Sequence, residues 1–320
     1  MLITPHVFPS LRLLSYACGA GARNHDCSKG PLALYEFGLE KYLTEIGLDA
    51  NWHEKPLSLN MAQHNDFSHM IDASLRLMPQ IKKTLLEKNF PVMLGGDHSM
   101  AMSSWSSVAN YHHAIESFGL IWVDAHMDAH TPKTSPSGAF HGMPLAALLG
   151  YGNPDWLSIG MTKRVLSPAH VTLIGVRDFE TEENIFLRSQ GVKIFTMDEI
   201  NKIGLEAAFE EALLRATSHT RGFGITIDLD VFDPEEAPGV GSPAAKGLHS
   251  DEFLQTIRSM RLLKNYKKLK AIEIAEYNPK LDIENRTAAL TASLIGAMLG
   301  MNHKMPMMQK LSRQNFLSEV

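Results

Sequence analysis

The sequence predicts an α/β fold with three layers, in which a mostly parallel, doubly wound sheet carries helices on both faces. Short apolar runs alternate along the chain with longer segments of helical periodicity, a pattern typical of βα units. Several of these runs are almost continuously apolar, as expected for strands buried on both faces of a parallel sheet. The 320 residues, 44% of them hydrophobic, are enough to bury a large core.

The strands and the clearest helices can be placed by residue number. Strands are expected at residues 11–17, 90–96, 118–125, 171–178, 192–197, 222–230 and 269–276. Helices are expected at residues 69–89, 250–264 and 284–300. Ser250 is a plausible N-cap for the second of these, because acidic residues follow it, and Gly300 a C-cap for the third.

Composition limits the classes of function. We expect one domain over residues 1–320, because the chain shows no repeat, low-complexity segment or dividing linker. A net charge of −5 offers no basic surface for nucleic acid, and the absence of a long apolar run predicts no membrane span. Cys18 and Cys27 are expected to be free thiols in the cytoplasm. The basic, Met-rich tail at 303–320 is either a solvated end or an oligomer contact.

The stretch IWVDAHMDAH, residues 121–130, places Asp124, His126, Asp128 and His130 at every second position after an apolar run. Alternate side chains of a strand point to the same face, so these groups would crowd one surface. Carboxylates held so close repel one another and lose water, which is costly unless cations accompany them. A divalent metal ion is the simplest such cation.

Other expected strands also end in ionisable side chains. His98 follows GGD, Asp228 and Asp230 end the strand in GITIDLD, and Glu276 follows the last strand. In open α/β sheets, ligands bind beyond the carboxyl ends of the strands. A lone group of this kind is usually a polar turn, but several arriving together indicate one site.

The types of side chain indicate the metal and the chemistry. Carboxylates with two imidazoles and no thiolate favour Mn²⁺, with Co²⁺, Fe²⁺ or Zn²⁺ as substitutes. Four negative charges are excessive for one ion, so we expect two, and a pair of ions that activates a bridging water indicates hydrolysis. His141, in a Gly-flanked polar loop, is either a proton shuttle or a loop histidine without a role.

The motifs GGDHS, DAHMDAH, SGAFHGMP, DLDVFDP and EIAEYNP, in this order, resemble the signature of the ureohydrolase superfamily. These proteins are binuclear manganese hydrolases of guanidine groups, and HGMP preceded by SPSG is more similar to arginases than to agmatinases. The resemblance implies an arginase-like fold and two Mn²⁺ per chain. The implied metal ligands are His98, Asp124, His126, Asp128, Asp228 and Asp230, with Asp124 and Asp228 bridging the two ions.

The resemblance also implies the reaction, which is hydrolysis of L-arginine to L-ornithine and urea by a metal-bridging hydroxide. Asp128 would pass a proton to the departing amine, His141 would exchange protons with solvent, and Glu276 would orient the guanidinium group. The residues implied at the amino-acid end of the substrate are His130, Ser137, Glu180 and Ser242.

That end of the pocket departs from the usual arginase pattern. His130 and Ala139 stand where arginases usually carry Asn, and Glu180 stands where they carry Asp. His130 could compensate as a cation, or it could signal another guanidino or amidino substrate, such as agmatine, guanidinobutyrate or formimidoylglutamate.

Two further alternatives stay open at this point. One is a non-catalytic homologue that binds guanidino compounds. The other is a hydrolase of a different bond, like the single-zinc deacetylases of similar architecture. The resemblance suggests a homo-oligomer, either a trimer or a hexamer.

Overall fold

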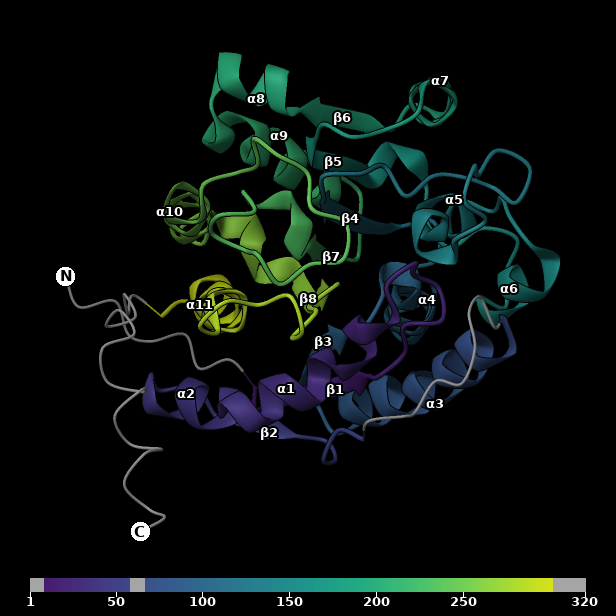
Figure 1. Cartoon of the computed structure of the whole chain (residues 1–320). Helices are drawn as coiled ribbons and strands as arrows, with labels where there is room; N and C mark the ends of the chain where they lie inside the picture. Colours follow the sequence, from purple (N-terminus) through teal and green to yellow (C-terminus); the bar gives the residue numbers. More distant parts are fainter. Residues whose placement is uncertain (1–8, 58–66, 302–320) are drawn as a thin grey trace, which may run out of the picture.

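An eight-stranded sheet crosses the middle of the computed structural model, which describes residues 9–57 and 67–301 (Figure 1). All neighbouring strands within this part of the chain pair in parallel. The strands are β1 Leu11–Tyr16, β2 Ala50–Trp52, β3 Phe90–Gly95, β4 Phe118–Val123, β5 Val171–Val176, β6 Lys193–Thr196, β7 Gly222–Asp228 and β8 Leu269–Ala275. The seven predicted strands are all present, and β2, with three residues, was missed.

The order of the strands is β2-β1-β3-β8-β7-β4-β5-β6. The four strands that carry ionisable side chains at their carboxyl ends, β3, β8, β7 and β4, are therefore adjacent in the centre of the sheet. Parallel pairing puts those four ends at the same edge, where open α/β sheets bind ligands.

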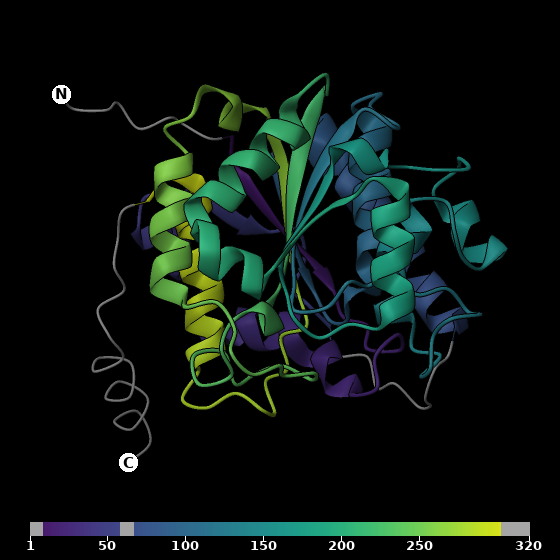
Figure 2. The ribbon, with the colours of Figure 1, turned by 90° about the horizontal axis from the view of Figure 1, so that it is seen from above.

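Helices cover both faces of the sheet, as Figure 2 shows. The helices are α1 Gly30–Phe37, α2 Leu39–Glu45, α3 Phe67–Leu86, α4 Ala101–Tyr111, α5 Pro144–Leu148, α6 Pro154–Ile159, α7 Thr181–Gln190, α8 Met197–Ile203, α9 Leu205–Thr217, α10 Ser250–Met260 and α11 Arg286–Leu299. One apolar core joins the sheet to α1, α2, α9, α10 and α11, and a second joins its other face to α3, α4, α5 and α6. The predicted α/β class and three layers are confirmed.

The helix ends correct one prediction. Helix α11 ends at Gly300, whose φ of 98° suits glycine, as expected. Ser250, however, is the first residue of α10 and not its N-cap, which is His249. The Glu236 carboxylate caps this helix instead, since it accepts hydrogen bonds from the Ser250 backbone N–H at 2.8 Å and from the His249 ring at 2.9 Å. A cap supplied from 14 residues earlier leaves no local sequence signal.

Two other expectations can be compared with the structure. Cys18 and Cys27 are both buried and no disulfide joins them, which agrees with the prediction of two thiols. Among the described residues, no helix is both long and apolar enough to cross a membrane. The tail at 303–320, expected to be a solvated end or an oligomer contact, lies outside the described residues.

Candidate metal centre and substrate pocket

A buried cluster of carboxylates surrounds His98 at the carboxyl edge of the central strands. His98 follows β3, and its Nδ1 atom lies 3.3 Å from Asp124 Oδ2, 3.1 Å from Asp128 Oδ2 and 3.3 Å from Asp228 Oδ2. The Nδ1 atom of His98 and the Oδ2 atom of Asp128 are buried without a hydrogen-bond partner. Buried polar atoms are rarely left unsatisfied, so their convergence fits a bound cation.

A second cluster shares Asp124 with the first. The Nδ1 atom of His126 lies 3.0 Å from Asp230 Oδ2 and 3.6 Å from Asp124 Oδ1. Asp230 in turn donates its backbone N–H to the Asp228 carboxylate at 3.0 Å, so the two clusters adjoin. All six predicted metal ligands are thus brought together, and Asp124 lies between the two histidines, where a bridging ligand would be.

The crowded charges shift the pKa values of these groups. Burial, and then the Asp124 charge, raise the pKa of Asp128 to about 7. Burial, and then the Asp230 charge, hold the pKa of Asp228 well above its usual range. Burial would lower the pKa of His98, but Asp124 and Asp128 outweigh it, and the pKa is raised. Without metal, protons bound to these carboxyl groups partly neutralise the negative charge of the cluster. Divalent ions would displace these protons when they bind.

Further buried side chains orient the predicted metal ligands His98 and Asp124. The Nε2 atom of His98 lies 2.8 Å from the Thr226 hydroxyl, which donates a 2.7 Å hydrogen bond to the buried Glu273 carboxylate. The indole N–H of Trp105 donates to the same carboxylate, and that of Trp122 donates to Asp124 at 2.9 Å. Such partners fix ring orientation and generally strengthen metal binding.

The backbone at the site is also specialised. Asp128 and Glu276 have φ values of 51° and 68°, in a region that non-glycine residues seldom adopt. Gly96 permits a close approach of β1 and β3, since a Cβ there would collide with the carbonyl oxygen of Cys18. Strained residues persist where the surrounding structure holds them, and they concentrate at functional sites.

His141 and Glu276 form a pair at the edge of the metal cluster. The Nδ1 atom of His141 lies 3.1 Å from Glu276 Oε1, which also accepts a 2.8 Å hydrogen bond from the His98 backbone N–H. Burial would lower the pKa of His141, but the charges of Glu276 and Asp128 outweigh it and raise the pKa to about 9. Of the pair, His141 lines the cavity above the metal cluster.

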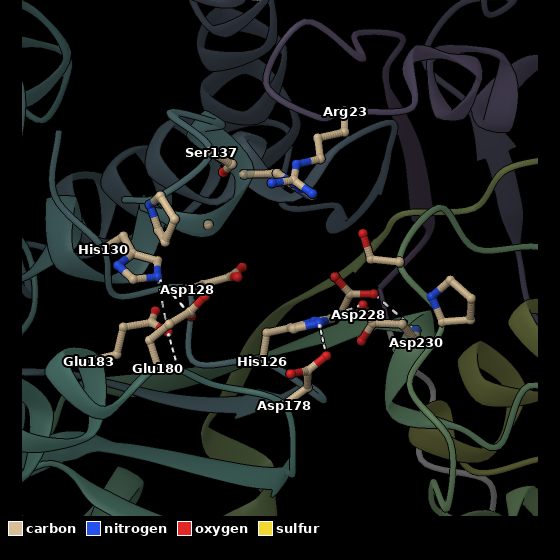
Figure 3. Close-up of a pocket in the computed structure, with 15 residues that line it drawn as sticks. Arg23, His126, Asp128, His130, Ser137, Asp178, Glu180, Glu183, Asp228 and Asp230 are labelled. Atoms are coloured by element: carbon tan, nitrogen blue, oxygen red, sulfur yellow. Dashed lines mark hydrogen bonds and ion pairs between the residues drawn. The ribbon is translucent and has the colours of Figure 1, made fainter. Parts of the chain in front are cut away.

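An open cavity of about 310 Å³ lies above the cluster, within the size range of small-molecule sites (Figure 3). His130, Ser137, Glu180 and Ser242, all predicted to bind substrate, line it. His130 is engaged on both sides of its ring. Its Nε2 atom lies 3.0 Å from Glu180 Oε2 and 3.3 Å from Glu183 Oε2, and its Nδ1 atom lies 3.2 Å from the Thr134 hydroxyl.

Sequence reasoning missed several polar residues of the site. Arg23, Asp178 and Glu183 line the cavity, and Thr226 and Glu273 lie behind His98. A weak signal existed for the last of these, because Glu273 interrupts the apolar run AIEIA of its strand. Arg23 and Asp178 lie in loops, Glu183 lies in α7 and Thr226 in β7, and each meets the site only through contacts with distant segments.

Fold and site together define an α/β protein with a buried carboxylate–imidazole centre suited to divalent metal ions. A family model described as the Arginase family matches residues 11–300. The chain is 39% identical to the arginase of Bacillus caldovelox over 72% of this chain and 75% of that protein. It is 32% identical to the arginase of Staphylococcus aureus strain MRSA252 over 88% of this chain and 93% of that protein. The chain belongs to the arginase family, which confirms the resemblance seen in the motifs.

Solved structures agree with this assignment. The crystal structure of arginase from Bacillus cereus superimposes with a TM-score of 0.83 at 32% identity, over 92% of this chain and all of that one (100%).

Proposed function

We propose that the protein hydrolyses L-arginine to L-ornithine and urea. The observation that carries this proposal is the convergence of the six acid and imidazole side chains from the ends of β3, β4 and β7 beneath a polar cavity. Membership of the arginase family and the relatives named arginase support the choice of substrate.

Two divalent metal ions, Mn²⁺ in our proposal and Co²⁺ as a substitute, would be held by the cluster. One would bind His98, Asp124, Asp128 and Asp228, and the other Asp124, His126, Asp228 and Asp230. The donor set fits, because it is rich in oxygen, contains two imidazoles and leaves buried polar atoms unsatisfied. When bound, such a pair supplies an activated water at neutral pH and positive charge that stabilises the reacting centre.

Three side chains of the protein would handle the guanidinium group and the protons. Glu276 would accept hydrogen bonds from the planar N–H donors, a charge-assisted geometry that carboxylates match well. Asp128 would deliver a proton to the departing amine. His141, held by Glu276 and facing the cavity, would exchange protons with solvent.

The amino-acid end of the substrate would lie among the polar residues of the cavity wall. The Glu180 carboxylate is half-exposed to the cavity and would attract the α-ammonium group. His130 would hold Glu180 and Glu183 together, and Ser137 and Ser242 would offer hydroxyl groups. All of these would bind substrate without taking part in bond cleavage.

Product analysis of the manganese-loaded protein tests the proposal. We expect urea from L-arginine and little from agmatine or guanidinobutyrate, and no formamide from formimidoylglutamate. Urea from agmatine alone would contradict the proposed substrate. Binding of L-arginine without turnover, at full metal occupancy, would contradict catalysis and favour a non-catalytic guanidino-binding protein.

We further propose that residues 1–320 form one domain that assembles into a cytoplasmic homo-oligomer, a trimer or a hexamer. The resemblance to the ureohydrolase superfamily supports this proposal. Light scattering coupled to size-exclusion chromatography tests it, and a monomeric mass would contradict it.

A further inference from the structure

The charges around the cavity are unevenly distributed. Asp178, Glu180 and Glu183 gather on one wall, beside the metal cluster. Arg23 lies across the cavity, next to Ser137 (Figure 3). Among the described residues that line the cavity, Arg23 is the one lysine or arginine side chain. A ligand in this cavity therefore meets a permanent cation at one side and carboxylates at the other.

The guanidinium group of Arg23 is available for a ligand. Its side chain is exposed and, within residues 9–57 and 67–301, forms no hydrogen bond or ion pair. The pocket carboxylates have other contacts, because Glu180 and Glu183 lie against His130, and Asp178 lies 3.7 Å from His126 Nε2. Figure 3 shows the Arg23 guanidinium turned toward the open part of the cavity.

The backbone holds Arg23 at this place. The preceding Gly21 donates its N–H to the buried Asp97 carboxylate at 2.9 Å, and its carbonyl accepts the N–H of His141 at 3.0 Å. The following Asn24 caps a short helical turn, accepting from the Asp26 N–H at 3.2 Å. Gly21 therefore fixes the loop to Asp97, which follows β3, and to the segment that carries His141 and Ser137.

We propose that Arg23 binds the carboxylate of the substrate and determines specificity for guanidino acids over guanidino amines. Guanidinium and carboxylate groups form paired, charge-assisted hydrogen bonds, and Ser137 adds a hydroxyl donor beside them. His130 does not take this role, because its ring nitrogens already contact Glu180, Glu183 and Thr134. With Glu180 on the opposite wall, the cavity matches both charged groups of an α-amino acid. This inference rests on the proposed function and names the residue that selects its substrate.

The test compares Arg23→Ala with the wild-type protein on L-arginine and on agmatine, which lacks the carboxylate. We expect KM for L-arginine to rise about 10-fold with kcat nearly unchanged, since a charged hydrogen bond at an exposed site is lost from substrate and transition state alike. The constants for agmatine should stay within about twofold. Arg23→Lys should recover part of the loss, and Arg76→Ala, an exposed arginine on α3, should behave as wild type.

Calorimetry separates this inference from the proposed function. L-ornithine should bind Arg23→Ala about 10-fold more weakly than wild type, while 1,4-diaminobutane should bind both equally. If wild type and Arg23→Ala bound L-ornithine with equal affinity, whether strong or weak, the role of Arg23 would be overturned. Absence of urea release from L-arginine by the wild-type protein would instead overturn the proposed function.

Discussion

Asp128→Asn is predicted to stabilise the metal-free protein while it removes one of the two metal ions and abolishes urea release. Asp128 is 6% exposed, and its Oδ2 atom has no hydrogen-bond partner. The substitution keeps the shape of the side chain and removes the charge. It also suits the backbone, because asparagine tolerates the φ of 51° at least as well as aspartate.

The pKa of Asp128 sets the size of the effect. Burial and Asp124 raise it from 3.8 to about 7 in the folded protein. A carboxyl group whose pKa is raised on folding destabilises the fold when ionised; the penalty is complete above pH 7 and vanishes below pH 3.8. It amounts to about 4 kcal/mol at pH 8 and about 2 kcal/mol at pH 5.5. At about 2.1 cal/mol/K per residue, the larger figure corresponds to a Tm rise of about 6 °C.

Thermal unfolding with and without Mn²⁺ provides the assay. In EDTA at pH 8, Asp128→Asn should melt above wild type, and the difference should shrink at pH 5.5. With Mn²⁺ at about 100 times its Kd, wild type should gain about 2.7 kcal/mol per ion, and Asp128→Asn should gain about 2.7 kcal/mol less because it loses the ion that Asp128 binds, so the difference in Tm should narrow. Asp72→Asn, at an exposed position of α3, is the matched control. The reasoning would be refuted if the variant melted below wild type in EDTA, or if Mn²⁺ raised its Tm as much as it raises that of wild type.

Three other substitutions test separate parts of the site. His141→Asn should lower kcat about 100-fold or more while metal content stays at the wild-type level, and unchanged activity would exclude the proton shuttle. His130→Asn should raise KM for L-arginine about fivefold with little change in kcat, because Glu180 and Glu183 lose their common partner; an unchanged KM would mean that their placement does not depend on His130. Glu273→Gln should weaken metal affinity about 10-fold, measured by chelator competition, and equal affinity would show that the Thr226 contact does not orient His98.

The sequence was sufficient to predict the fold class and the set of side chains that converge. Apolar runs ending in Asp, His or Glu predicted strands whose carboxyl ends meet, and β3, β4, β7 and β8 are indeed adjacent. The order of the strands could not be read, because it depends on contacts between segments far apart in the chain. Strand β2 was missed because three residues carry no periodic pattern.

The residues that the sequence did not reveal owe their place to tertiary structure. Arg23 lies in a polar loop that resembles any solvated loop until the contacts of Gly21 with Asp97 and His141 bring it to the cavity. Glu236 caps α10 from a separate segment. The engagement of His130 by two glutamates depends on how α7 begins beside the cavity, and no spacing in the sequence records it.

Metal content measured together with urea release tests the central claim most directly. Elemental analysis of the active protein should find two divalent ions per chain. Exhaustive chelation should abolish urea release from L-arginine, and added Mn²⁺ should restore it. A chelated protein that contains no divalent metal and still releases urea at the full rate would contradict the account.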